Sequence, residues 1–137
     1  MVKLTEQMIN DLKKITVLPL ATASASGAPN VVPIATKMMV LQSDNETVWM
    51  IDNFMQKTLE NMKANPRASI YVWSPETSSS YQFKGDVQVE TDGADYEKAK
   101  AHAKSIKPDA PAKSLVKFRI TEVYSVAPGA TAGKRLL

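Results

Sequence analysis

The feature that most constrains the fold is a change of hydrophobic period in the middle of the chain. Residues 47–51 are typical of a strand, and the apolar residues that follow recur at helical spacing. Pro66 then ends the helix, because proline lacks an N–H and disfavours helical geometry in the residue before it. Residues 67–73 are again apolar and strand-like. The pattern therefore predicts a strand, a helix that begins near Asn53, and a second strand.

Lys57 and Thr58 lie in the first part of this predicted helix. A helix start presents unpaired N–H groups and the positive end of the macrodipole, so an ammonium group and a hydroxyl beside it would complete a phosphate site. No glycine-rich loop precedes the pair, and lysine followed by threonine is also common on solvated helices. The residues alone leave both interpretations open, a phosphate site and an ordinary helix surface.

The composition of the chain limits the kinds of catalytic and metal site that it can form. The chain has 137 residues, 44% of them hydrophobic and 23% charged, as expected for one globular domain over residues 1–137. It has no cysteine and one histidine, which argues against thiolate catalysis, disulfides, a Cys- or His-ligated metal and a Ser-His-Asp relay. We therefore expect no catalytic side chain and no metal site, and any difficult chemistry would be a cofactor's.

The charge of the chain favours an anionic partner. The net charge is +3 and the sequence pI is near 9.1. The lysines are spread over the predicted helices and tail rather than gathered with aromatic residues, so a small anionic ligand fits better than a nucleic acid. No apolar run is long enough to span a bilayer, and the N-terminal residues lack the apolar segment of a secretory signal. We expect a cytoplasmic protein with no membrane partner.

Six or seven strands and two or three short helices are predicted along the chain. Residues 1–16 contain an amphipathic helix with Thr5 as its N-cap, and residues 128–137 form a tail that is mobile unless it docks. An alanine-rich helix is predicted over residues 94–104, and strands over residues 17–24, 30–36, 37–41, 47–51, 67–73, 81–90 and 114–126. Most strand pairs have no helix between them, so an antiparallel sheet that closes on itself is the most economical architecture.

The last two strands each carry an irregularity. Gly85 interrupts the alternation of its strand and is a candidate for a bulge or a close approach. The alternation of the final strand slips between Ile120 and Val123, near Glu122, which predicts an irregularity there. Trp49 and Trp73 are expected in the core. The single histidine, His102, is expected on the solvated face of a helix.

The order and spacing of these features resemble those of the pyridoxamine 5′-phosphate oxidase-like flavin-binding split barrels, most closely their small single-domain FMN-binding members. The resemblance covers residues 4–126. It implies a mainly β fold, a six-stranded antiparallel split β-barrel that forms a homodimer with one FMN at each end of the subunit interface. The features that match are the paired strands around Ser26-Gly27, the strand leading into residues 53–58, the Asn65-Pro66-Arg67 stop, and the Phe83-Lys84-Gly85 strand followed by Asp-Gly and a helix.

The resemblance also implies which residues hold the cofactor. Lys57 and Thr58 match the basic residue and the hydroxyl that bind the FMN phosphate. Gln82 or Ser80 would reach the flavin from the second subunit. The other cofactor-binding residues that it implies are Ile51, Asp52 and Asn53 beside the ribityl chain and phosphate, and Val32, Pro33 and Ile34 along the isoalloxazine ring.

Two departures from the family pattern limit the functional expectation. Many relatives carry Arg or Ser just before the phosphate-site lysine, where this chain has Met55-Gln56, and the C-terminal element by which true oxidases hold their substrate is not evident in residues 128–137. Vitamin B6 oxidation is therefore not expected. The expected function is an FMN-binding oxidoreductase of unknown substrate. The alternatives are an FMN-binding electron carrier, a split barrel that uses deazaflavin or haem, and a dimeric barrel that binds no ligand.

Overall fold

A computed structural model describes residues 2–137. Its strands form one antiparallel sheet in the order β2-β1-β5-β6-β7-β4-β3. Within the described chain no helix is both long and apolar enough to cross a membrane. The helices are α1 (Glu6–Lys13), the 3₁₀ helix η1 (Thr36–Met38), α2 (Lys57–Ala64) and α3 (Ala94–Ile106). The strands are β1 (Val17–Ala23), β2 (Pro29–Ala35), β3 (Met39–Leu41), β4 (Thr47–Asp52), β5 (Arg67–Val72), β6 (Tyr81–Glu90) and β7 (Ser114–Ser125).

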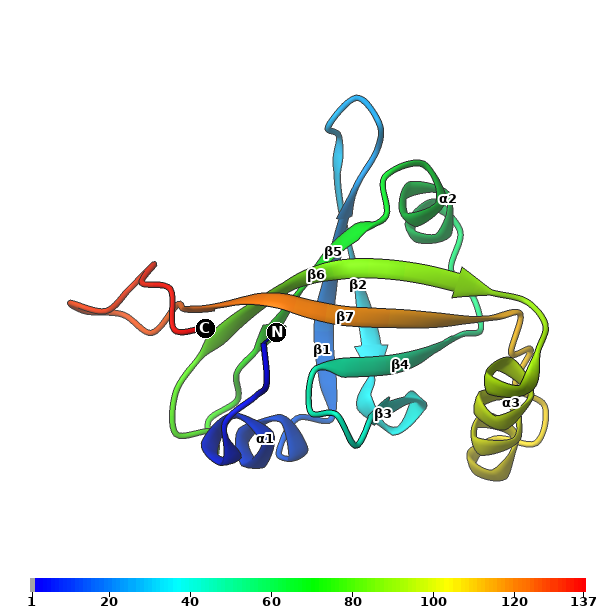
Figure 1. The fold of residues 1–137 in the computed structure, drawn as a ribbon, viewed down its shortest axis with the longest axis horizontal. Coiled ribbons are helices and arrows are strands. Elements are labelled where there is room, and N and C mark those ends of the chain that lie inside the picture. The colour runs from blue at the N-terminus through cyan, green and yellow to red at the C-terminus, as the bar shows by residue number, and fades with distance from the viewer. Residues whose placement is uncertain (1) are drawn as a thin grey trace.

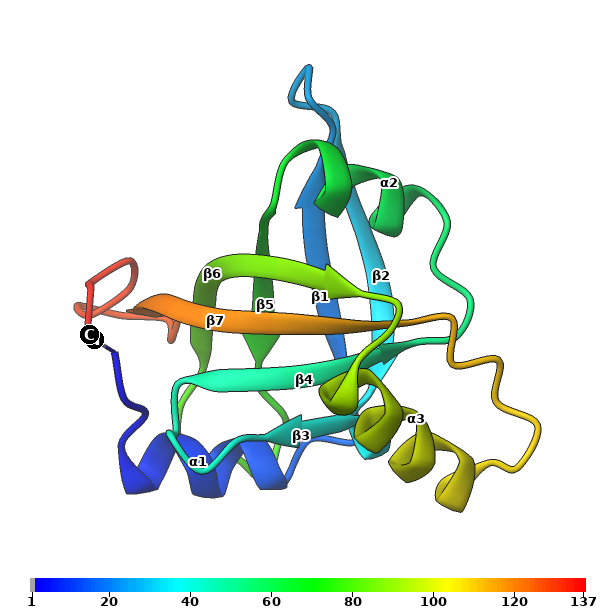
Figure 2. The same ribbon diagram turned by 45° about the vertical axis from the view of Figure 1, so that its right-hand side comes forward.

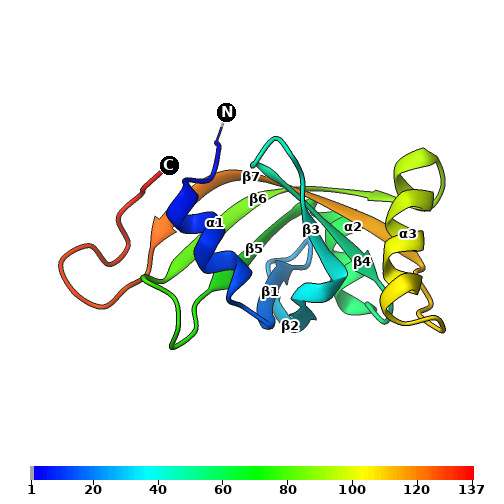
Figure 3. The same cartoon turned by 90° about the horizontal axis from the view of Figure 1, so that it is seen from below.

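The sheet is strongly curled, so that β1 and β2 run across the direction of β6, β7 and β4 (Figure 1). Alternation along the strands decides which side chains face the inside of the curl. In β1, Leu18 and Leu20 are buried while Val17 and Pro19 are exposed. The apolar face of α1 joins this core as the helix crosses one end of the sheet (Figures 2 and 3). The curled antiparallel architecture expected from the sequence is confirmed, with seven strands where the resemblance implied six.

A buried carboxylate fixes α1 on the sheet. Asp11 accepts hydrogen bonds from the Ser78 N–H at 2.8 Å, the Ser78 hydroxyl at 2.6 Å and the Tyr81 hydroxyl at 2.9 Å. Burial by itself would raise the pKa of Asp11, but these bonds and the nearby Lys14 ammonium outweigh it and hold that pKa below its usual value. The carboxylate thus joins α1 both to the loop after β5 and to β6.

The two predicted irregularities are one β-bulge. The pairing of β6 with β7 shifts between Lys84 and Gly85, which leaves Thr121 of β7 as the extra residue. A Cβ atom on Gly85 would overlap the backbone carbonyl of Arg119, so this close approach of the strands requires glycine. The bulge lies where the sheet curls.

Three predicted features differ from the structure. The helix expected near Asn53 begins at Lys57, because residues 53–56 form a separate turn. Residues 36–38, expected in strands, belong to η1. Trp73, expected in the core, is 51% exposed just beyond β5.

The C-terminal tail docks on β7. The Ser125 N–H donates to the Lys134 carbonyl at 2.8 Å, and the Leu136 N–H donates to the Val123 carbonyl at 2.7 Å. Residues 134–137 therefore pair with the end of β7 that β4 does not reach.

Candidate functional site

The carboxylate of Asp52 organises the connection between β4 and α2. It is fully buried and accepts hydrogen bonds from the Met55 N–H at 2.8 Å and the Ser114 hydroxyl at 2.9 Å. The Lys113 Nζ lies 3.7 Å from the same carboxylate. These contacts hold residues 53–56 in a turn and delay the start of the helix. Asp52 therefore supports the connection between β4 and α2 through its buried carboxylate.

The N-terminus of α2 faces this turn without a side-chain cap. Gln56 occupies the N-cap position, and in the described structure its side chain makes no capping hydrogen bond. The N–H groups of the first turn are thus available to a ligand. Lys57 is exposed, whereas Thr58 is only 1% exposed. The Thr58 Oγ accepts a hydrogen bond from the Asn30 side-chain amide at 3.0 Å, which leaves its own hydrogen to donate.

A cavity of about 670 Å³ lies beside this helix end. Its size is typical of small-molecule sites. Of the site residues predicted for this subunit, all line it except Asp52. Ser80 and Gln82, predicted to reach the flavin from the second subunit, are not among its lining residues. The lining residues are Asn30, Val32, Pro33, Ile34, Ala35, Lys37 and Met38 from β2 and η1, Ile51, Asn53, Phe54, Met55, Gln56, Lys57 and Thr58 from β4 to α2, and Lys107 after α3.

One wall of the cavity is apolar and rigid. Val32, Ile34 and Ile51 come from strands of the sheet, and the last two are buried. Asn53 stands at the end of this wall, and its side-chain oxygen accepts a hydrogen bond from the Ala112 N–H at 3.0 Å. A flat ring can lie against such a wall, while the polar groups gather at the helix end.

The charged groups on the cavity wall are all cationic. Lys37, Lys57 and Lys107 line it, and no Asp or Glu stands among the lining residues of the described chain. The Lys107 Nζ lies 5.5 Å from the centroid of the Phe54 ring, and that ring is 70% exposed at the cavity rim. Unopposed positive charge in a concave site raises the local concentration of anions.

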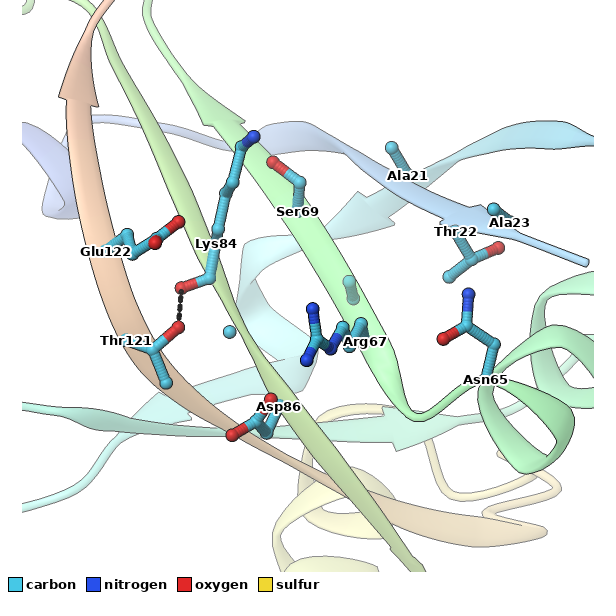
Figure 4. Close-up of a pocket in the computed structure, with 12 residues that line it drawn as sticks. Ala21, Thr22, Ala23, Asn65, Arg67, Ser69, Lys84, Asp86, Thr121 and Glu122 are labelled. Atoms are coloured by element: carbon cyan, nitrogen blue, oxygen red, sulfur yellow. Dashed lines mark hydrogen bonds between the residues drawn. The ribbon is translucent and has the colours of Figure 1, made fainter. Parts of the chain in front are cut away.

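A second hollow, of about 550 Å³, lies on the outer face of β1, β5, β6 and β7 (Figure 4). Its charges come in opposite pairs on neighbouring strands. Arg67 is the cross-strand partner of Asp86, and Lys84 is the partner of Glu122. Because the lining carries as many negative as positive side chains, the hollow attracts an anion less strongly than the cavity beside α2 does.

His102 lies outside the wall of the larger cavity. Its Nε2 is 3.2 Å from the Lys37 carbonyl oxygen, so it is half-buried between α3 and η1 rather than fully solvated as expected. With Trp49 it lines a separate pocket of about 160 Å³.

Comparison with known proteins places the chain in a family. The family model of pyridoxamine 5′-phosphate oxidase matches residues 4–127. The chain belongs to this family. An uncharacterised protein of Methanocaldococcus jannaschii is 37% identical over 133 residues, which cover 97% of this chain and 87% of that protein. The crystal structure of HupZ from Group A Streptococcus has 27% identity and a TM-score of 0.78, covering 95% of this chain and 99% of HupZ.

More distant structures share the fold with this family member. An FMN-binding protein from Syntrophomonas wolfei has 17% identity and a TM-score of 0.67, over 89% of this chain and 90% of that one. HutZ, a haem storage protein from Vibrio cholerae, has 17% identity and a TM-score of 0.68, over 90% of this chain and 95% of HutZ. An F420 reductase has 21% identity and a TM-score of 0.65, over 88% of this chain and 98% of the reductase. One architecture thus serves several ligands, and the ligand must be argued from this chain's residues.

Sequence reasoning missed four polar residues of the cavity, Asn30, Lys37, Gln56 and Lys107. Lys37 follows the strand that was expected along the ring, so extending that segment by a few residues would have found it. Asn30 lies on the same face of its strand as Val32 and Ile34, so alternation along the predicted strand could have found it. Lys107 reaches the cavity only because α3 folds against the other elements, and no local pattern signals it.

Proposed function

We propose that this family member binds FMN in the cavity beside α2 and acts as an oxidoreductase. One observation carries the proposal. The start of α2, which has no side-chain cap, carries Lys57 and Thr58, and both residues line a cavity whose wall charges are all positive. A phosphate dianion is the group that such a helix end suits best.

The rest of the cavity fits a flavin. Asn53 and Ile51 would lie beside the ribityl chain, and buried Asp52 would support the turn that carries the phosphate site. The ring system would lie along Val32, Pro33 and Ile34, held mainly by shape and main-chain groups. Bound FMN would supply a ring that accepts hydride or electrons, while the chain orients it and excludes water.

The cavity favours FMN over haem. His102 is the only histidine in the sequence, and the cavity wall of the described chain does not include it. Haem iron in this cavity would therefore lack an imidazole ligand from this subunit. A deazaflavin such as F420 has a flat ring that would suit the same wall, so competition between FMN and deazaflavin is the appropriate test.

Turnover separates an enzyme from an electron carrier. Among the described residues, the cavity wall carries no carboxylate or imidazole that could serve as a general acid or base, a feature that also suits a carrier. We expect the FMN-loaded protein to oxidise NADH or NADPH catalytically. Bound FMN without turnover by either donor would favour the carrier function.

We also propose a homodimer with the cofactor at its interface. On the outer face of β2, β1 and β5, Val31 is 64% exposed, Val17 57% and Tyr71 40%. Together they form an apolar patch of the kind that marks an interface. Pro33 belongs to this face and also lines the cavity. A second copy that covers the face would reach the cavity rim. The absence of cysteine suits the reducing cytoplasm, which we propose as the compartment.

A further inference from the structure

We propose that Asn30 is a positioning residue that aims the Thr58 hydroxyl at the cofactor phosphate. The β1–β2 hairpin would then take part in phosphate binding although it supplies no charge. This inference rests on the proposed function and deepens it. It explains how a neutral residue, distant in sequence from the start of α2, sets the affinity of the phosphate site.

The Thr58 hydroxyl, like any hydroxyl, can donate one hydrogen and accept at two lone pairs. The Asn30 Nδ2 donates to the Thr58 Oγ1 at 3.0 Å, and this bond directs the hydroxyl hydrogen away from the amide. Both residues line the cavity. Thr58 is 1% exposed, so its hydroxyl has few directions in which to donate, and the cavity is one of them.

The place of Thr58 in its helix supports the same orientation. Inside a helix, a threonine hydroxyl commonly donates to the carbonyl four residues earlier. Thr58 is the second residue of α2, so the residue four positions earlier, Phe54, lies in the turn before the helix. A phosphate at the helix end would offer a stronger, charged acceptor.

A second hydrogen bond between the β1–β2 hairpin and α2 provides a matched control. The Asn61 Nδ2, one turn further along α2, donates to the Thr22 Oγ1 at 3.1 Å. Thr22 is the cross-strand partner of Asn30, so both bonds leave the hairpin from one pair of residues. Neither Thr22 nor Asn61 is among the described residues that line the cavity. The two bonds have the same chemistry, and only one involves a hydroxyl at the cavity.

The test compares the affinities of the purified full chain for FMN and for riboflavin, which lacks the phosphate. Asn30→Ala should weaken FMN binding by roughly three- to tenfold, the value of one hydrogen bond, and leave riboflavin binding unchanged. Asn30→Asp should weaken FMN binding further, because a carboxylate only accepts and would take the Thr58 hydrogen. Asn61→Ala should lower the thermal stability and leave the ratio of the two affinities unchanged.

A double-mutant cycle isolates the positioning role. In a Thr58→Val background, Asn30→Ala should change the FMN-to-riboflavin ratio no further. The inference is wrong if Asn30→Ala keeps the wild-type ratio, if Asn61→Ala lowers the ratio equally, or if the effect of Asn30→Ala persists without the hydroxyl. If the wild-type protein does not prefer FMN to riboflavin, the proposed phosphate site itself is wrong, and the inference falls with it.

Discussion

At the scale of single residues, Lys57 is the strongest test of the phosphate site. Lys57 is the first residue of α2, so in the proposed site its charge and the helix dipole would act on the same anion. Lys57→Ala should weaken FMN binding about tenfold, or ~1.4 kcal/mol, measured by quenching of flavin fluorescence. Lys63→Ala, in the last turn of the same helix, should have little effect. Equal losses in the two variants would show a general charge effect and not a site.

Gly85 makes a prediction about stability. Its missing Cβ lets β6 approach the Arg119 carbonyl at the bulge. Gly85→Ala should lower the free energy of unfolding by about 1–3 kcal/mol, because the strands must move apart. Denaturant titration measures the change, with Gln88→Ala on the exposed face of β6 as the control. A change no larger than that of the control would mean that the bulge tolerates a side chain.

The residues that sequence reasoning found and missed differ in how they reach the site. Lys57 and Thr58 are adjacent in sequence and stand at a helix end, so a local pattern was enough to nominate them. Asp52 lies on the same segment, but its carboxylate turns inward to Ser114, and only the tertiary structure reveals this. Asn30 meets Thr58 through a contact 28 residues apart, which no local pattern encodes.

At the scale of elements, the docking of α1 should depend on pH. The hydrogen bonds to Asp11 hold its folded-state pKa below the unfolded value of about 3.9. Its contribution to stability is therefore fully present above that unfolded value and is lost as the pH falls through the folded-state pKa. Thermal unfolding measured between pH 6 and pH 2 should show wild type losing stability below about pH 4.

The matched variant for this prediction is Asp11→Asn. It should already be less stable at neutral pH, because an amide cannot accept all the bonds that Ser78 and Tyr81 donate. It should also lose less stability on acidification than wild type does. If the two proteins lose stability in parallel, Asp11 is not the group that titrates.

The elements that the sequence predicts best are those whose burial alternates cleanly. The strand expected over residues 81–90 has those bounds in the structure, because its inward side chains meet the core at every second position. The predictions at the start of α2 and at the short helix η1 were wrong for a common reason. Contacts with distant parts of the chain, Ser114 for the first and α3 for the second, override the local hydrophobic period at these places.

At the scale of the whole molecule, the apolar outer face of β2, β1 and β5 should be the subunit interface. Val31→Glu places a charge in the middle of that face and should shift the protein from dimer to monomer, measured by light scattering after size-exclusion chromatography. FMN binding should weaken together with the dimer, because the same face borders the cavity. Val40→Glu, on β3, is the control and should remain dimeric. A monomeric wild type, or a dimeric Val31→Glu variant, would contradict the proposed interface.

The order of strands, turns and helices was enough to predict a curled antiparallel sheet, because short connections allow few other topologies. The bulge between β6 and β7 was signalled by Gly85 and by the slip near Glu122, whereas the docking of α1 through Asp11 is a tertiary feature. Which single apolar side chains remain exposed is also decided by the tertiary structure. Trp73, expected in the core because its side chain is apolar, lies on the surface.

Retention of FMN tests the proposed site most directly. The purified protein is mixed with excess FMN, passed through ultrafiltration to remove free ligand, and examined by absorbance spectroscopy. We expect close to one flavin per chain, with little retained by the Lys57→Ala variant. A wild-type protein that retains no flavin, or one that takes up deazaflavin or haem in its place, would contradict FMN binding at the cavity beside α2.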